Sequence, residues 1–113
     1  MRMWMVAPRI LCRKHLLGEH VEIHMLVGTM KKGHSLKGYI ANNLIEPWAI
    51  IQRHNDLANE MINRGYRHLS PISSMQVNTL LMSYPYELKD VRVDVRASTF
   101  ELFRRCNECS NRH

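Results

Sequence analysis

The sequence predicts a mainly α-helical fold, a single compact domain with about three main helices. Its 113 residues are the length of one domain, and 45% apolar with 23% charged residues is typical of a globular chain. Two long segments have helix-compatible patterns and are followed by glycine, which is typical of helix ends. Because there is no internal repeat, low-complexity stretch or linker, we expect residues 1–113 to form one domain.

The first main helix is expected over about residues 11–30, followed by a basic turn and a glycine stop at 31–33. Its polar residues His15, Glu19 and Glu22 fall on one stripe, at helical spacing. Apolar side chains surround most of the remaining wheel, so we expect this helix to be buried in the middle of the domain. They are Leu16, Leu17, Val21, Ile23, Met25 and Val27.

A second helix is expected over about residues 46–64, because Pro47 suits a first helical position and Gly65 suits a C-terminal cap. A third is expected to begin at Ser98 and to reach about residue 106, because Ser98 and Glu101 have the spacing of a capping box.

Two segments between these helices are less regular. Residues 33–43 are expected to form a loop and a short helical turn, with Ser35 as its N-cap. Residues 66–97 contain two prolines and an alternating stretch at 91–95, which predicts either a short strand or an extended connector.

Charge and composition narrow the function. The formal net charge of +6 favours a polyanionic partner, and nucleic acid fits better than a membrane because no basic amphipathic helix with an aromatic face is evident. No export signal or membrane-spanning run is evident, and the cysteine count is odd, so we expect a cytoplasmic monomer with reduced thiols and no membrane partner. The motifs of ATP hydrolysis, NAD chemistry and serine hydrolysis are absent.

Glu19 and Glu22 have two interpretations. Carboxylates on a mostly apolar helix are costly to bury unless a cation or water compensates them. Either they form structural salt bridges with arginines near the N-terminus, or they face a water-filled cleft and act in catalysis. The arginines considered are Arg2, Arg9 and Arg13.

Two patterns could bind a metal. His20 and His24 lie one helical turn apart, but the glutamate between them is one position too late for a zincin, and hydrogen-bonded core histidines are the favoured interpretation. In the tail over residues 106–113, the C-x2-C pair of Cys106 and Cys109 is half of a zinc site, and His113 follows it. Cys12 or another histidine would have to complete the four ligands. The tail is therefore either flexible or metal-binding. We assign no metal ligand and expect no cofactor.

The N-terminal half nevertheless contains a recognisable set of motifs. Arg2 is followed by H-L-L-G-E-H-V-E at residues 15–22, R-H-N-D-L at 53–57 and R-G-Y at 64–66. This set resembles the phage-type pyrimidine-dimer DNA glycosylase family, best over about residues 1–30 and 46–66. The resemblance implies a mainly helical domain with the N-terminal segment threaded through the core, and a glycosylase coupled to an abasic-site lyase that needs no cofactor.

The resemblance also implies roles for individual residues. The nucleophile would be the α-amine of Met1, which we expect to be retained because Arg2 is too large for methionine removal. Glu22 would stabilise the cationic sugar and shuttle protons, Arg2 would contact phosphate, and His15 and Glu19 would position the substrate. The partner would be double-stranded DNA with damaged pyrimidines, such as cyclobutane dimers or a related lesion, or with abasic sites.

The chain departs from this family in two places. Val21 and Met25 stand where the best-known members have arginines, and a Cys/His tail replaces an aromatic, lysine-rich one. Other basic residues are therefore expected to bind phosphate. They are Arg9, Arg13, Lys14, Lys31, Lys32, Lys37, Arg104 and Arg105.

Two alternatives remain at this point. One is a non-catalytic, basic nucleic-acid-binding module with a zinc-stabilised Cys/His tail. The other is a small structural or regulatory interaction protein in which the histidines and carboxylates serve only the core.

Overall fold

The computed structural model describes residues 1–68 and 70–113, and the chain is mainly α-helical, as predicted. No strand occurs within those two ranges. The α-helices are α1 (Arg13–Lys31), α2 (Lys37–Ala41), α3 (Ile50–Asn63), α4 (Ser74–Met82), α5 (Val95–Arg105) and α6 (Asn107–Arg112). Three 3₁₀ helices accompany them: η1 (Pro8–Ile10), η2 (Pro47–Ala49) and η3 (Tyr86–Asp90).

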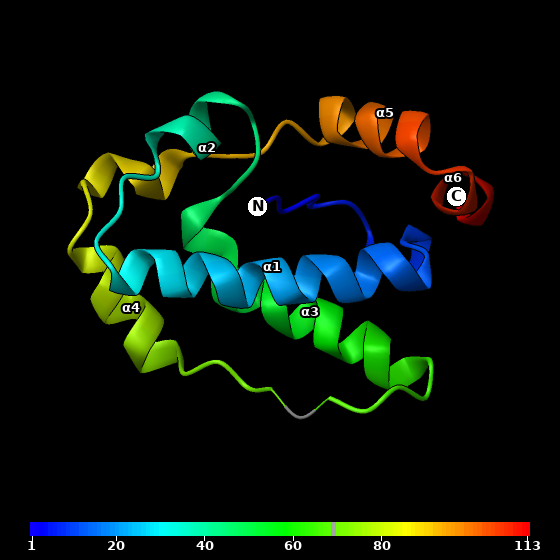
Figure 1. Cartoon of the computed structure of the whole chain (residues 1–113), viewed down its shortest axis with the longest axis horizontal. Coiled ribbons are helices and arrows are strands. Elements are labelled where there is room, and N and C mark those ends of the chain that lie inside the picture. The colour runs from blue at the N-terminus through cyan, green and yellow to red at the C-terminus, as the bar shows by residue number, and fades with distance from the viewer. Residues whose placement is uncertain (69) are drawn as a thin grey trace.

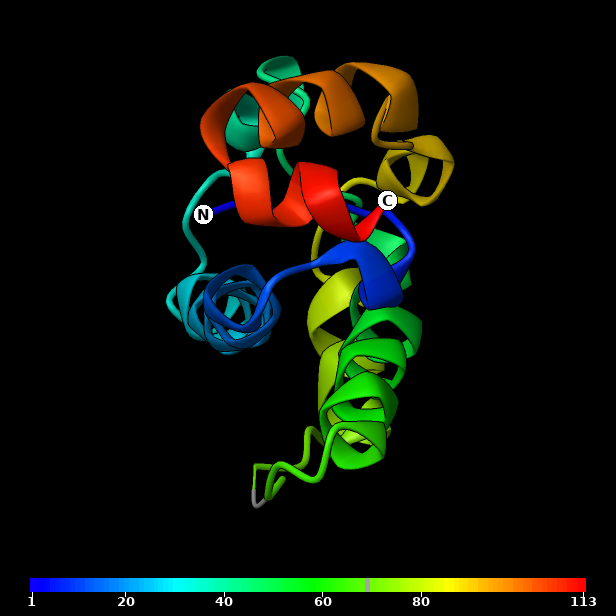
Figure 2. The ribbon, with the colours of Figure 1, turned by 90° about the vertical axis from the view of Figure 1, so that its right-hand side faces the viewer.

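The two longest helices, α1 and α3, pack against each other, and α5 and α6 lie above them as a second layer (Figure 1; Figure 2). The N-terminus lies between α1 and this second layer (Figure 2). The glycine stops are confirmed: Gly33 after α1 and Gly65 after α3 have φ angles of 72° and 82°, a region that glycine enters without strain.

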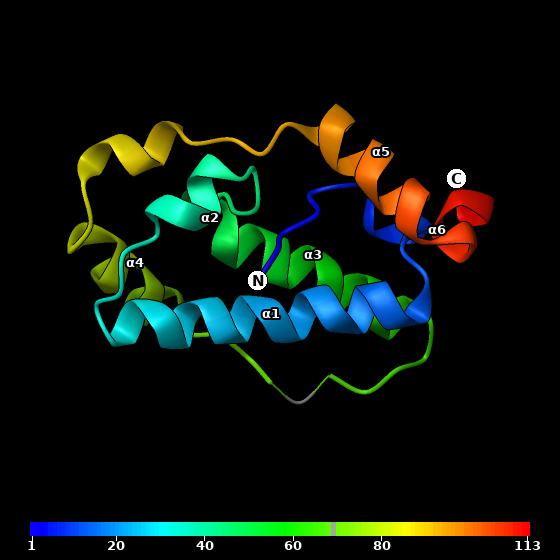
Figure 3. The same ribbon diagram turned by 45° about the horizontal axis from the view of Figure 1, so that its top comes forward.

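The first seven residues form no regular element, yet they run through the interior (Figure 3). Met3, Trp4 and Val6 are buried, which confirms the threaded N-terminal segment. The Met3 amide donates to the Leu44 carbonyl at 2.7 Å. The Ser98 hydroxyl of α5 donates to the carbonyl of Trp4 at 2.6 Å. Backbone groups of an irregular segment cannot be buried without such partners, so these bonds hold the terminus in place.

A buried ion pair joins the N-terminal segment to α1 and α3. The guanidinium of Arg53 on α3 makes two hydrogen bonds to the carboxylate of Glu19 on α1, at 2.6 and 2.9 Å. Its third hydrogen bond, also 2.6 Å, goes to the carbonyl of Val6. Both side chains are almost completely excluded from solvent. The structural interpretation of Glu19 is thus correct, but the partner is Arg53 and not Arg2, Arg9 or Arg13.

The prediction that the third helix begins at Ser98 is wrong. Helix α5 begins at Val95, because the Asp94 side chain caps it by accepting a hydrogen bond from the Ala97 amide. Ser98 lies inside the helix, and its hydroxyl is used instead on the Trp4 carbonyl. Its expected partner Glu101 forms ion pairs with Arg104 and Arg105.

The connecting segments also differ in detail from the expectations. Residues 66–97 contain α4 and η3, and residues 91–94 form an extended connector. Ser35 accepts a hydrogen bond from the Lys37 amide, but Leu36 occupies the N-cap position of α2. Helix α1 is not buried all round, because Val21 and Met25 are each 55% exposed. The face of α1 that carries Val21 and Met25 is therefore open to solvent.

The Arg53–Glu19 pair generates a stability prediction. We expect Glu19→Gln to lower the free energy of unfolding by about 3–5 kcal/mol, because Arg53 is left as a buried charge with no counterion. Replacing both residues together, with Glu19→Leu and Arg53→Met, should cost less than either change alone. Urea denaturation measures both effects. Glu101→Gln is the control and should change stability little, because Glu101 lies within α5 and its ion pairs are with the exposed Arg104 and Arg105. An equally stable Glu19→Gln protein would contradict the account.

Candidate active site

The N-terminus opens into a cavity of about 370 Å³ at the junction of α1 and α5. Its lining residues come from four parts of the chain: Met1, Arg2, Trp4, His15, Glu22, Leu44 and Arg105. A second hollow of about 480 Å³ adjoins it and shares Trp4, His15 and Glu22. The two hollows together form a cleft that runs along the open face of α1, from the chain terminus past Glu22 and Val21.

Met1 and Glu22, which the resemblance assigned to the chemistry, therefore line one cavity together with Arg2, which it assigned to phosphate binding. Arg2 is held in place by its neighbour, since its guanidinium carbon lies 4.4 Å from the centre of the Trp4 ring. The cavity thus brings the residue that carries the α-amine together with a carboxyl group.

Glu22 is half-buried, and its surroundings act on it in opposite directions. Burial raises the pKa of its carboxyl above the ordinary value of 4.5. The charge of the N-terminal amine lowers this pKa, Glu19 raises it, and Arg2 lowers it again. A carboxyl with a raised pKa exchanges protons more readily near neutral pH, which suits a general acid or base.

The three residues of the polar stripe on α1, His15, Glu19 and Glu22, have different contacts. Glu19 turns toward α3 and is neutralised by Arg53, whereas Glu22 faces the cavity. His15 lines both hollows, but its Nδ1 atom lies 3.2 Å from the sulfur of Cys12. Glu19 also borders the larger hollow, but its carboxylate is bound to Arg53.

Few of the expected phosphate-binding cations lie at the cleft. Lys14 lines the larger hollow, and Arg105, which comes from α5, lines the smaller one with Arg2. Arg13 stacks on the ring of Tyr66 at 4.8 Å. Arg9 lines a different hollow beside Asp56 and Glu60. Arg105 had no special signal in the sequence, because only the packing of α5 over the N-terminus brings it to the cavity.

A family model described as pyrimidine dimer DNA glycosylase matches residues 1–74, more than half of the 113-residue chain. The chain belongs to the pyrimidine dimer DNA glycosylase family. This membership indicates a glycosylase whose substrate is DNA, and it confirms the resemblance that the motifs indicated. No curated protein and no solved structure matches the chain. The matched range of this glycosylase includes Met1, Arg2 and Glu22, while α5 and α6 lie beyond it.

Two groups of side chains in the described ranges could hold a metal ion: Cys12, His15, Cys106 and Cys109, and separately His20, His54 and His68. In the second group, His20 Nε2 lies 3.1 Å from His54 Nε2 and 2.9 Å from His68 Nε2. Burial and the neighbouring histidines lower the pKa of His20 to about 4, which keeps its ring neutral. Hydrogen-bonded core histidines were the favoured interpretation for His20 and His24. His20 has hydrogen-bonding neighbours, whereas the Nε2 atom of His24 is buried without a partner among the described residues, and the expectation does not hold for His24.

None of the helices in the described ranges is long and apolar enough to cross a membrane.

The surroundings of Glu22 predict its titration. We expect the pKa of Glu22, measured by carbon NMR of the side-chain carboxyl, to lie above 4.5, because burial is the largest influence. The Arg2→Gln variant should raise this pKa further by removing a cation, and glutamine is large enough to preserve Met1. The other titratable or charged groups at this cavity are the N-terminal amine, Arg105 and His15. A value at or below 4.5 would contradict the claim that burial outweighs the neighbouring cations.

Proposed function

We propose that this glycosylase removes damaged pyrimidines and then cleaves the DNA strand at the abasic site, with the α-amine of Met1 as its nucleophile. The observation that carries the proposal is the shared cavity of Met1, Arg2 and Glu22, in a chain of the pyrimidine dimer DNA glycosylase family. Cyclobutane dimers or a closely related lesion are the proposed substrates.

The proposed reaction uses only groups in this cavity. The amine nitrogen bonds to C1′ of the deoxyribose as the bond from C1′ to the base breaks, and the base leaves with the electron pair and a proton. Opening of the bond between C1′ and O4′ turns the adduct into a protonated imine, and O4′ takes up a proton. The imine acidifies the C2′ proton, whose removal expels the 3′-phosphate and breaks the strand.

Glu22 serves this sequence in two ways. Its carboxylate stabilises the positive charge that develops on the sugar, and its raised pKa suits it to deliver the proton to O4′ and to remove the one on C2′. The charge of the N-terminal amine lowers the pKa of Glu22, which is consistent with the two groups lining the same cavity.

The affinity for DNA is proposed to come from the cations around the cleft. Arg2, Lys14 and Arg105 surround it and can contact phosphates on either side of an extruded nucleotide. Val21 and Met25, exposed on the same open face of α1, offer an apolar surface to a base or sugar in place of the family's arginines. Lesion recognition is thus proposed to depend more on apolar contact than on added charge.

A second candidate is the non-catalytic binding module with a zinc-stabilised tail. The cluster of Cys12, His15, Cys106 and Cys109 favours its zinc component. The cavity at the chain terminus supports the first candidate, because a pure binding module has no use for an α-amine beside a carboxyl group.

Covalent trapping tests the nucleophile. We expect borohydride to crosslink the protein to a duplex with an abasic site, and peptide mass spectrometry to place the crosslink on an unprocessed Met1, because reduction converts the imine into a stable amine. Protein with an uncleaved N-terminal tag is the matched control and should not crosslink. A crosslink on a lysine side chain would overturn the assignment, and no crosslink to any duplex would favour the binding module.

The second functional test concerns the carboxylate. We expect Glu22→Gln to lose at least about a hundredfold in strand cleavage, because the amide keeps the shape but can neither neutralise the sugar cation nor exchange protons. Circular dichroism should show an unchanged fold. Glu87→Gln, on an exposed part of η3, is the matched control and should cleave at the wild-type rate. A fully active Glu22→Gln protein would mean that another group does this work.

A further inference from the structure

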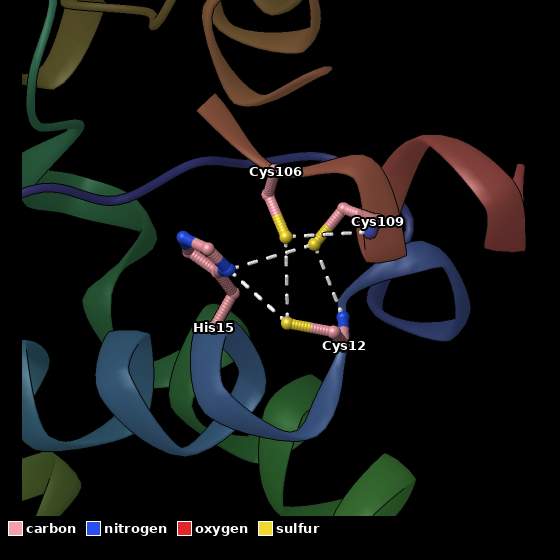
Figure 4. A group of neighbouring side chains, drawn as sticks. All are labelled: Cys12, His15, Cys106 and Cys109. Carbon is pink, nitrogen blue, oxygen red and sulfur yellow. Dashed lines mark hydrogen bonds between the residues drawn. The ribbon is translucent and has the colours of Figure 1, made fainter. Parts of the chain in front are cut away.

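Four potential metal ligands converge at the start of α1, outside the cavity chemistry described above (Figure 4). They come from two segments that each have two residues between the ligands, Cys12 with His15 and Cys106 with Cys109. Cys12 is the N-cap of α1, and Cys106 is the N-cap of α6. An N-cap residue and the residue three positions later lie on the same side of a helix start, so each segment presents two ligands to one point.

The distances in this cluster fit a tetrahedral zinc site. Zinc bonds of about 2.3 Å to sulfur and about 2.0–2.1 Å to nitrogen give tetrahedron edges of about 3.8 Å between sulfurs and about 3.6 Å between sulfur and nitrogen. The sulfurs of Cys12 and Cys106 are 3.8 Å apart. His15 Nδ1 lies 3.2 Å from the sulfur of Cys12 and 3.6 Å from that of Cys109. All four ligand atoms lie within 4.8 Å of one another.

The surroundings suit thiolates bound to a cation. The Cys12 amide donates to the sulfur of Cys109 at 3.1 Å, and the Cys109 amide donates to the sulfur of Cys106 at 3.4 Å. Such N–H to sulfur bonds are the outer interactions that orient thiolate ligands. Cys109 is completely buried and Cys12 is 3% exposed, while His15 and Cys106 are half-buried.

We propose that Cys12, His15, Cys106 and Cys109 bind one zinc ion as a structural site. Three thiolates and one imidazole are soft and borderline ligands that select zinc among the abundant divalent ions, and a set of four protein ligands leaves no open position for substrate. Binding releases the three thiol protons to solvent. His113, the expected tail ligand, is not part of the set and packs against the ring of Phe103.

The site has a structural consequence for the cavity. It links Cys12 and Cys106, which are 94 positions apart, and so fixes the end of α5 against the start of α1. Arg105, the residue before Cys106, lines the cavity with Met1 and Arg2. The zinc ion therefore supports one wall of the cavity from outside. This inference does not rest on the proposed lyase chemistry.

The first test uses the unaltered protein. Chain produced in zinc-supplemented medium under reducing conditions should contain about one zinc ion per molecule by plasma mass spectrometry. A mercurial reagent that titrates thiols should release that zinc in step with thiol modification. Zinc-free protein, zinc that survives complete thiol modification, or a disulfide in the native protein would each overturn the proposal. None of these outcomes depends on a variant that might not fold.

Variants then identify the ligands. Cys109→Ser should lose the zinc, while His113→Ala, the matched control in the same tail, should keep it. His15→Cys should retain zinc with four thiolates, whereas His15→Ala should bind it more weakly. The cobalt-substituted protein should show the thiolate-to-metal charge-transfer bands of a tetrahedral site, which a site at His20, His54 and His68 cannot produce. Cobalt binding without those bands, or full zinc content in Cys109→Ser, would contradict the assignment.

Discussion

The ion pair between Arg53 and Glu19 is the interaction on which the arrangement of this protein depends. It is buried, it joins the two longest helices, and the same guanidinium holds the carbonyl of Val6. One cation thus sets the spacing of α1 and α3 and anchors the N-terminal segment against both. Because Glu22 lies three residues after Glu19 on α1, fixing this pair also fixes where the chain terminus meets the carboxyl group of the cavity. A buried pair of this kind adds little net stability, but removing one partner is costly, so it acts mainly as a positional constraint.

The second layer, α5 and α6, contacts the N-terminal segment and the start of α1. Helix α5 bonds to the Trp4 carbonyl through Ser98 and brings Arg105 to the cavity, while α6 brings Cys106 and Cys109 to the start of α1. The family match ends at residue 74, before either helix. The part of the chain shared with the pyrimidine dimer DNA glycosylase family therefore contains the proposed nucleophile and carboxyl group. The part beyond it covers the N-terminal segment and, with zinc bound, would be fastened there by metal instead of by a larger apolar core.

Local signals in the sequence were sufficient to predict the long helices but not the contacts between them. Gly33 and Gly65 act on their own neighbours, so the C-terminal ends of α1 and α3 could be predicted. The expected start of the second helix near residue 46 was early, because Pro47 begins the 3₁₀ helix η2 and α3 begins at Ile50. The start of α5 could not be predicted, because Asp94 and Ser98 are both good caps and only the distant Trp4 carbonyl decides between them. The partner of Glu19 was missed for the same reason, since Arg53 is 34 positions away.

The residues of the candidate active site could be predicted only where the family resemblance named them. Met1, Arg2 and Glu22 were named from motifs, and the fold brings them to one cavity. The full ligand set of the metal cluster could not be predicted from the sequence. Cys106 and Cys109 were recognised as half a site, and Cys12 as one way to complete it, but His15 was assigned to the substrate because its helical stripe pointed that way. Its sulfur neighbours are visible only once α6 is placed over α1.

The most direct test of the account moves the terminal amine without removing it. A chain with one glycine left ahead of Met1 after tag cleavage keeps an α-amine and every side chain, but displaces the amine by about 3.5 Å. Because the Arg53 anchor prevents the N-terminal segment from sliding back, cleavage of an abasic-site duplex should fall at least about a hundredfold, with an unchanged unfolding midpoint. Cleavage at the rate of the unextended chain would contradict the claim that this buried ion pair places the amine at Glu22.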